Sequence, residues 1–91
     1  MHYMVIEHFR AAGAEVEVYR RFAAHGRLAP AGLAYVTSWV DTDVRRCYQV
    51  MATDERHLLE TWMAAWADLI DFEVHEVITS AEAAVKMAPR L

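Results

Sequence analysis

Four polar side chains interrupt stretches of sequence that are otherwise apolar and strand-like. Glu7 lies in the first such stretch, Gln49 in the third, and Glu73 and His75 in the last. Two carboxylates held together in a semi-buried site raise the pKa of one of them, and such a group is a general acid or base. If the first and last strands are neighbours, Glu7 and Glu73 meet. Glu7, Glu73 and His75 are therefore the candidate catalytic residues.

The same side chains also have a structural explanation. Arg20, Arg21 or Arg46 could form ion pairs with the carboxylates, or the carboxylates could reach solvent at one end of a sheet. Ion pairs of this kind perturb pKa values without any catalytic role. Gln49 has a similar alternative, because a buried amide can simply hydrogen-bond to the backbone.

Three tryptophans provide a second set of candidates. Trp62 and Trp66 are four residues apart, which places them on one face of a helix, and Trp39 lies on a strand that this helix could cover. With Gln49, they are the predicted ligand-binding residues of an aromatic-walled pocket. The alternative is a tryptophan-rich core. An indole N–H directed at a cavity, and a cavity of about 300 Å³ or more, would favour the pocket.

Metal and cofactor chemistry have little support. The five histidines form no H-x-H or H-E-x-x-H pattern, and His57 with Glu60 supplies only two ligands, so no metal is predicted. In-phase strand pairing is expected to place His8 and His75 on different faces. Cys47 is the only cysteine and is expected to be a buried small hydrophobe. No phosphate-binding glycine loop or G-x-S-x-G is present, and no cofactor is predicted.

Length and composition narrow the class of protein. The chain has 91 residues, 56% of them hydrophobic, with nine basic and thirteen acidic side chains. These values predict a single domain over residues 1–91, and no basic stripe suggests nucleic acid as a partner. The N-terminus has no signal-peptide pattern, and no apolar run approaches the roughly 20 residues of a membrane span. A cytoplasmic location is expected.

The apolar periodicity predicts seven elements. Gly26 suits the end of the first helix, Thr53 or Asp54 is expected to cap the second, and Ser80 the third. A turn at 41–44 joins the middle strands, but its length leaves their register open by one residue. The predicted strands are 2–9, 33–40, 45–52 and 72–79, and the predicted helices are 14–25, 54–69 and 81–87.

The order of these elements predicts an α+β fold of the ferredoxin-like type. Two split βαβ units with right-handed crossovers give a four-stranded antiparallel sheet of order 4-1-3-2 with two helices on one face. The strands are apolar on both faces, so the face without helices needs a partner. We expect a second copy to cover it, which makes a homodimer of the dimeric α/β-barrel type.

The chain also resembles a known family. The resemblance covers nearly the whole sequence in the blocks YMVIEHF, GR..P.GL.YV.SWV, CYQVM.T and LLETWMAAWADLIDFEV, and is most specific between Trp62 and Glu73. The family consists of small bacterial proteins catalogued as a domain of unknown function and placed with the dimeric α/β-barrel proteins. The resemblance implies the fold and a dimer but no reaction. Ala52 departs from the pattern, in which a glutamate is expected between Met51 and Thr53.

Three hypotheses for function follow. The first is a homodimer that binds a small, partly aromatic organic molecule between the sheet and the helices. The second is a cofactor-free oxygenase or isomerase in which Glu7, Glu73 or His75 transfers a proton. The third is a structural or regulatory dimer without a ligand, whose tryptophans only pack. A filled interior would favour the third.

Overall fold

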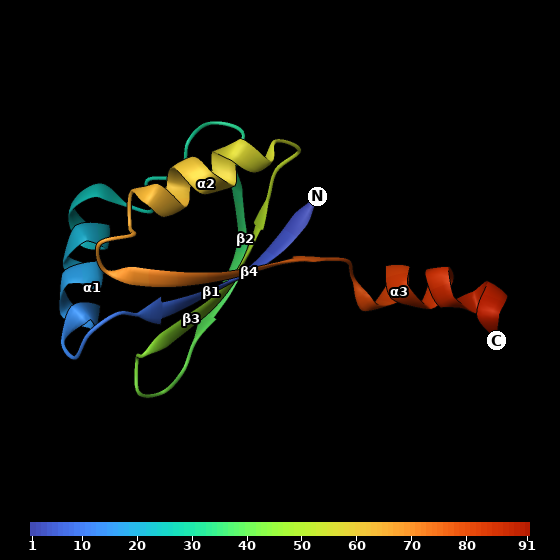
Figure 1. Cartoon of the computed structure of the whole chain (residues 1–91), viewed down its shortest axis with the longest axis horizontal. Coiled ribbons are helices and arrows are strands. Elements are labelled where there is room, and N and C mark those ends of the chain that lie inside the picture. Colours follow the sequence, from blue (N-terminus) through green and yellow to red (C-terminus); the bar gives the residue numbers. More distant parts are fainter.

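The structure is a computed structural model that describes all residues from 1 to 91 (Figure 1). The elements follow the predicted order. They are β1 (His2–Phe9), α1 (Ala14–His25), β2 (Ala34–Val40), β3 (Arg46–Ala52), α2 (Arg56–Ala64), β4 (Ile70–Val77), α3 (Ser80–Met87) and a terminal 3₁₀ turn, η1 (Ala88–Arg90).

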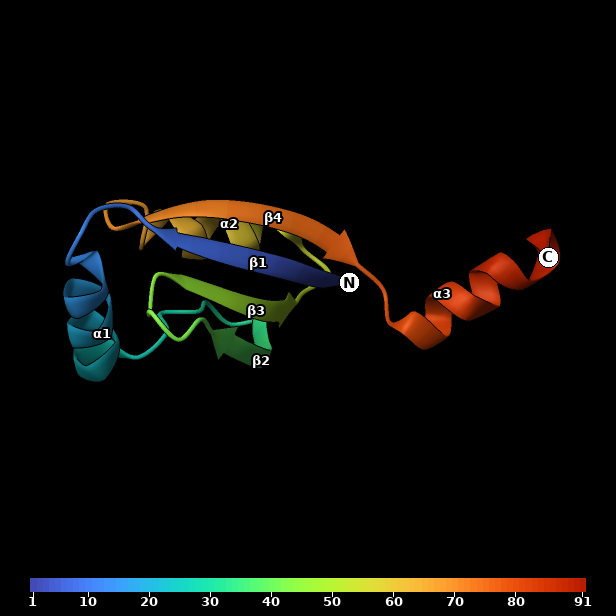
Figure 2. The same ribbon diagram turned by 90° about the horizontal axis from the view of Figure 1, so that it is seen from below.

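The four strands form one antiparallel sheet in the order β2-β3-β1-β4, which is the predicted order read from the other edge (Figure 2). Residues of both α1 and α2 belong to the main core. Val18 of α1 and Leu59 of α2 are in one buried cluster with Val5 of β1 and Met51 of β3. The core therefore lies between these helices and a single face of the sheet, called the covered face below.

Strand register determines which residues belong to the covered face. In β1 and β3, Val5 lies opposite Gln49 and Glu7 lies opposite Cys47, and all four are buried. Directly opposed residues of antiparallel strands point to the same side. The side chains of β1 thus alternate between the two faces of the sheet, as the predicted strand at 2–9 requires. Glu7 belongs to the covered face.

The second helix is shorter than predicted. It starts at Arg56 and ends at Ala64 instead of continuing to Leu69. After Ala64 the backbone N–H groups donate to the carbonyl three residues earlier in the chain, as Trp66 does to Met63. The chain therefore tightens into turns. The N-cap is Glu55, and neither Thr53 nor Asp54 takes this place. β4 consequently begins at Ile70, two residues earlier than expected.

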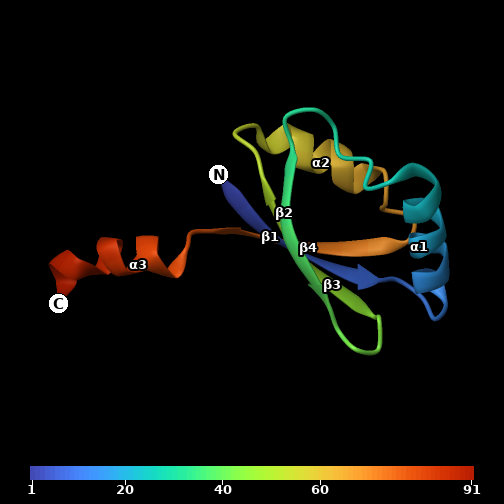
Figure 3. The same cartoon turned by 180° about the vertical axis from the view of Figure 1, so that it is seen from behind.

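The third helix projects away from the rest of the molecule (Figures 1 and 3). Thr79, not Ser80, is its N-cap, because the Thr79 hydroxyl accepts from the Glu82 N–H at 3.0 Å and the Glu82 carboxylate accepts from the Thr79 N–H at 3.1 Å. This capping box starts the helix independently of tertiary contacts. No side chain of α3 is buried, and the helix does not cover the sheet.

The face of the sheet opposite the core is called the open face. Its middle is apolar, with partly buried Met4, Ile6 and Val50 and the 75% exposed Trp39. β4 adds a polar strip to this face, which consists of Asp71, Glu73 and His75.

Candidate ligand pocket

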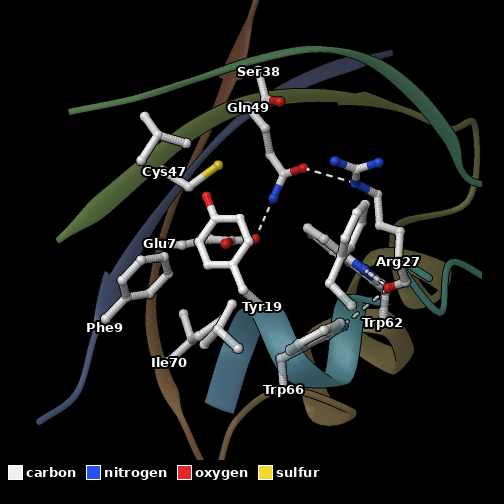
Figure 4. Close-up of a pocket in the computed structure, with 13 residues that line it drawn as sticks. Glu7, Phe9, Tyr19, Arg27, Ser38, Cys47, Gln49, Trp62, Trp66 and Ile70 are labelled. Atoms are coloured by element: carbon white, nitrogen blue, oxygen red, sulfur yellow. Dashed lines mark hydrogen bonds between the residues drawn. The ribbon is translucent and has the colours of Figure 1, made fainter. Parts of the chain in front are cut away.

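A pocket of about 210 Å³ lies on the covered face, between the sheet, α1 and the turns after α2 (Figure 4). Most of its lining is apolar or aromatic. The side chains that line it are Glu7, Phe9, Val18, Tyr19, Phe22, Arg27, Ser38, Val40, Cys47, Gln49, Trp62, Trp66 and Ile70.

One wall of the pocket is a chain of three polar side chains. Gln49 links the other two, because its amide nitrogen donates to Glu7 Oε2 and its amide oxygen accepts from Arg27 Nε at 3.2 Å (Figure 4). The two contacts fix the orientation of the amide, since only its oxygen can accept from a guanidinium. Gln49 therefore holds Glu7 in place, and its amide bonds to two side chains rather than to the backbone.

The two helix-side tryptophans hold the segment that carries Arg27. The indole N–H groups of Trp62 and Trp66 both donate to the backbone carbonyl of Arg27, at 2.9 and 3.0 Å. Their rings line the pocket, but their polar atoms are directed at a carbonyl and not at the cavity. Both residues are almost fully buried, so Trp62 and Trp66 build the pocket wall and the core together.

The guanidinium of Arg27 is flanked by two aromatic rings. Its Cζ lies 3.7 Å from the ring centroid of Tyr35 and 5.2 Å from that of Phe22. Stacking on ring faces holds a guanidinium in a defined plane. Arg27 is thereby fixed from both its backbone and its side chain, and it supplies a positive charge beside the Gln49–Glu7 pair.

Glu7 has the most unusual electrostatic environment in the site. Burial raises the pKa of its carboxyl from 4.5 to about 7, although the charge of Arg27 and the hydrogen bond from Gln49 act in the opposite direction. Desolvation outweighs both because only 7% of the residue is exposed. At neutral pH, Glu7 is therefore present in both protonation states.

Two further titratable groups near Glu7, the Cys47 thiol and the Tyr19 hydroxyl, are neutral at neutral pH. Burial and, to a smaller extent, the nearby Glu7 raise the pKa of the Cys47 thiol to about 12, although Arg27 acts in the opposite direction, so a nucleophilic thiolate is not available. Burial also raises the pKa of the Tyr19 hydroxyl, with smaller contributions from Cys47 and Glu7. Tyr19 is 45% exposed and stands where the pocket opens to solvent.

Three of the predicted site residues lie elsewhere. Trp39 faces the open side of the sheet, since it is opposite Tyr48 while the pocket residue Gln49 is opposite Ser38, so the expectation that a helix covers it was wrong. Glu73 is opposite Ile6, and Glu7 is opposite Phe72, so the two carboxylates point to opposite faces and do not meet.

Glu73 and His75 form a separate cluster with His8 on the open face. The Glu73 carboxylate accepts from His75 Nε2 at 2.7 Å and from His8 Nε2 at 3.2 Å, and these bonds lower its pKa. His8 and His75 therefore share a face, contrary to expectation, because His75 pairs with Met4, which is four residues from His8 and so points to the same side of β1. No group of three or more His, Cys, Asp or Glu side chains is arranged to hold a metal ion.

Two residues of the pocket, Arg27 and Tyr19, are not predicted from the sequence as site residues. Arg27 lies between the predicted helix at 14–25 and the predicted strand at 33–40, and Tyr19 lies inside that helix, where no site residue is predicted. The signal available for Arg27 was its position directly after a helix-ending glycine, between aromatic Phe22 and Tyr35. That spacing does not reveal a contact with Gln49, which is 22 residues away.

The fold and this site define an α+β protein of ferredoxin-like topology with a small cavity between its sheet and its helices. The chain belongs to the family described as a domain of unknown function (DUF3303), whose model matches residues 1–91. The predicted resemblance is thus confirmed. No curated protein sequence matches the chain. None of the helices is both long and apolar enough to cross a membrane.

Proposed function

We propose that this protein binds a small organic molecule with one ring in the pocket on the covered face. The observation that carries the proposal is an apolar, partly aromatic cavity with a single polar wall, fixed by the Arg27–Gln49–Glu7 chain. Ligand sites are typically apolar cavities with a few placed polar groups. A preformed wall of this kind orients a ligand without having to rearrange.

The size of the cavity limits the ligand. At about 210 Å³ it is below the range of about 300 Å³ or more that is usual for drug-sized ligands. An apolar cavity of about 150 Å³ is known to accept benzene, so this pocket has room for one six-membered ring with a small substituent. Fused two-ring molecules are too large unless the side chains at the opening move.

Within the pocket, the proposed roles follow from position. The rings of Trp66 and Phe22 offer flat apolar surfaces to the ligand, and Gln49 and Glu7 offer the polar contact. Trp62 serves mainly as core, since it is only 1% exposed. Trp39, on the opposite face of the sheet, has no part in this site.

Saturation-transfer NMR with benzoate, phenol, benzoquinone and cyclohexanone tests the proposal. We expect a signal for at least one ring compound, abolished by Val40→Trp, because Val40 lines the pocket where it opens. Val36→Trp is the matched control, since Val36 is an exposed residue of the same strand outside the pocket. If the wild-type protein binds none of these compounds, or if Val40→Trp and Val36→Trp bind them equally well, a structural or regulatory dimer without a ligand is favoured.

We also propose that the protein is a homodimer joined through the open face. The support is the apolar middle of this face, where Met4, Ile6, Val50 and the largely exposed Trp39 lie together and no helix of the chain covers them. An exposed apolar patch of this kind is typical of an interaction surface. Two such faces packed together give the barrel-like dimer that the sequence predicts.

Light scattering at micromolar concentration tests the assembly. We expect a mass near 20.8 kDa, twice the 10.4 kDa of the chain. Trp39→Asp places a charge in the proposed interface and should give a monomer. Val16→Asp, on the exposed side of α1, is the control and should remain a dimer. A soluble 10.4 kDa wild-type protein would exclude the homodimer.

A further inference from the structure

We propose, on the basis of the ligand pocket above, that Glu7 is a proton-transfer group for small cyclic carbonyl compounds and that the Tyr19 hydroxyl stabilises the enolate oxygen. Two polar atoms of the pocket, Glu7 Oε1 and the Tyr19 hydroxyl, have no hydrogen-bond partner in the protein and remain free for a ligand. It goes beyond binding because it names a substrate class and a reaction, the enolisation of a ring ketone.

The free oxygen of Glu7 is the first observation. Gln49 donates to Oε2, whereas Oε1 has no hydrogen-bond partner in the protein. No fully buried side-chain oxygen or nitrogen of the protein lacks a partner, so Oε1 is not sealed in the core. Because Glu7 lines the pocket, Oε1 is accessible from the cavity. A fixed carboxyl with one free oxygen directed at a ligand cavity is the arrangement that a general base requires.

The second observation is the hydroxyl of Tyr19. This side chain lies beside Glu7 at the pocket, and its hydroxyl has no hydrogen-bond partner in the protein (Figure 4). The pKa of this hydroxyl is raised, so it remains a neutral O–H donor throughout the neutral range. A neutral O–H donor in the same pocket as a base can stabilise the oxygen of an enolate as negative charge develops there.

The apolar walls of the pocket are the third observation, because they remove Glu7 from water. Desolvation is what shifts the titration of Glu7 to neutral pH, where the carboxylate can take a proton and the acid can return it. No redox group is needed for such a reaction, and the positive charge of Arg27 favours the ionised form of Glu7.

The reaction balances without a further reagent. Glu7 Oε1 takes a proton from the carbon next to the carbonyl, and the electron pair of that C–H bond forms a C=C bond. The π pair of the carbonyl moves to its oxygen, which accepts the Tyr19 O–H. The proton on Glu7 exchanges with solvent, and Glu7 then returns a proton as the electron pair on the enolate oxygen re-forms the carbonyl. The proton goes to the same carbon or, in a ring whose C=C bond begins one carbon further from the carbonyl, to the far end of that double bond, which then becomes conjugated with the carbonyl. The second outcome is an isomerisation.

Exchange of the α-protons of cyclohexanone in D₂O, followed by NMR, tests the proposal with the full-length protein. We expect exchange faster than in buffer, with a rate that rises with pH and reaches half its maximum near pH 7. Glu7→Gln should lower the rate by at least about 100-fold, within the range typical of general base catalysis. Tyr19→Phe should lower it on the order of tenfold, less than a buried oxyanion donor because water can replace the hydroxyl.

Binding is measured on the same samples by saturation transfer, which separates the two proposals. Glu76→Gln, an exposed glutamate of β4, is the control and should exchange at the wild-type rate. Cyclohexanone that binds but exchanges at the buffer rate, or a Glu7→Gln protein that exchanges like the wild type, would overturn the proton-transfer role and leave ligand binding standing. If no ring compound binds, both proposals are wrong.

Discussion

Replacement of Glu7 by glutamine gives the sharpest stability test of the pocket. Glutamine has the same shape and still accepts a hydrogen bond from Gln49, but it cannot ionise. In the wild type, burial raises the pKa of Glu7 from 4.5 to about 7. At about 1.4 kcal/mol per unit, ionisation of the folded protein costs about 3 kcal/mol relative to ionisation of the unfolded chain.

The sign of the pH dependence follows from the direction of the shift. A raised pKa means that the folded state holds its proton more tightly than the unfolded state. The contribution of Glu7 to the free energy of unfolding is therefore complete below about pH 4.5 and is lost as the pH rises through about 7. Glu7→Gln does not suffer this loss, so it should become more stable than the wild type by up to about 3 kcal/mol at pH 8.

Urea unfolding at pH 4.5, 6 and 8, followed by tryptophan fluorescence at a fixed protein concentration, measures the difference between the two proteins. The other acidic groups titrate equally in both and cancel. Glu76→Gln is the control and should follow the pH dependence of the wild type. Parallel curves for the wild type and Glu7→Gln across this range would refute the reasoning, because they would mean that Glu7 is not desolvated.

Three further predictions concern the surroundings of the pocket. Trp66→Phe removes one of the two indole donors to the Arg27 carbonyl and should lower the free energy of unfolding by about 1–2 kcal/mol in urea titrations, whereas equal stability would show that the bond is dispensable. Cys47 should react with iodoacetamide at pH 8 far more slowly than it does in 8 M urea, because burial keeps its thiol protonated; equal rates would contradict this. Removal of residues 80–91 deletes no buried side chain, so the shortened chain should keep its fold by circular dichroism, with a stability within about 0.5 kcal/mol, and unfolding would contradict the separate position of α3.

The sequence was a good guide to the fold because its signals are local and periodic. The alternation in β1 correctly predicted that Val5 and Glu7 share one face, since period-2 patterning depends only on neighbours along the chain. The helix at 14–25 was predicted at its true bounds for the same reason, with Gly26 as its C-terminal stop. The order of elements then left the ferredoxin-like sheet as the natural arrangement.

The position of Trp39 could not be predicted because a β-bulge inverts the alternation of β2. Tyr35 pairs with Met51 on the covered face, and regular alternation would place Trp39 on that face too. The pairing shifts between Tyr35 and Thr37, which inserts one residue and turns Trp39 to the open face, while Ser38 and Val40 take the covered one. No residue between Tyr35 and Thr37 is of a type that predicts a bulge.

The polar wall of the pocket was only half predictable. Glu7 and Gln49 were singled out because they are polar residues in apolar strands, and the structure brings these two together. The prediction that Glu7 meets Glu73 was wrong because the register pairs Glu7 with Phe72 and Glu73 with Ile6, which sends the two carboxylates to opposite faces. Arg27 was missed because its contact with Gln49 is made by a loop, whose path is set by the two indole bonds to its carbonyl.

The most direct test of the account is a crystal structure determined after soaking with cyclohexanone and with benzoate. The account predicts ring-shaped density on the covered face of the sheet, in contact with the ring of Trp66 and with a carbonyl or carboxyl oxygen near Glu7 and Gln49. A pocket closed by its own side chains, or ligand density found only elsewhere on the protein, would contradict it.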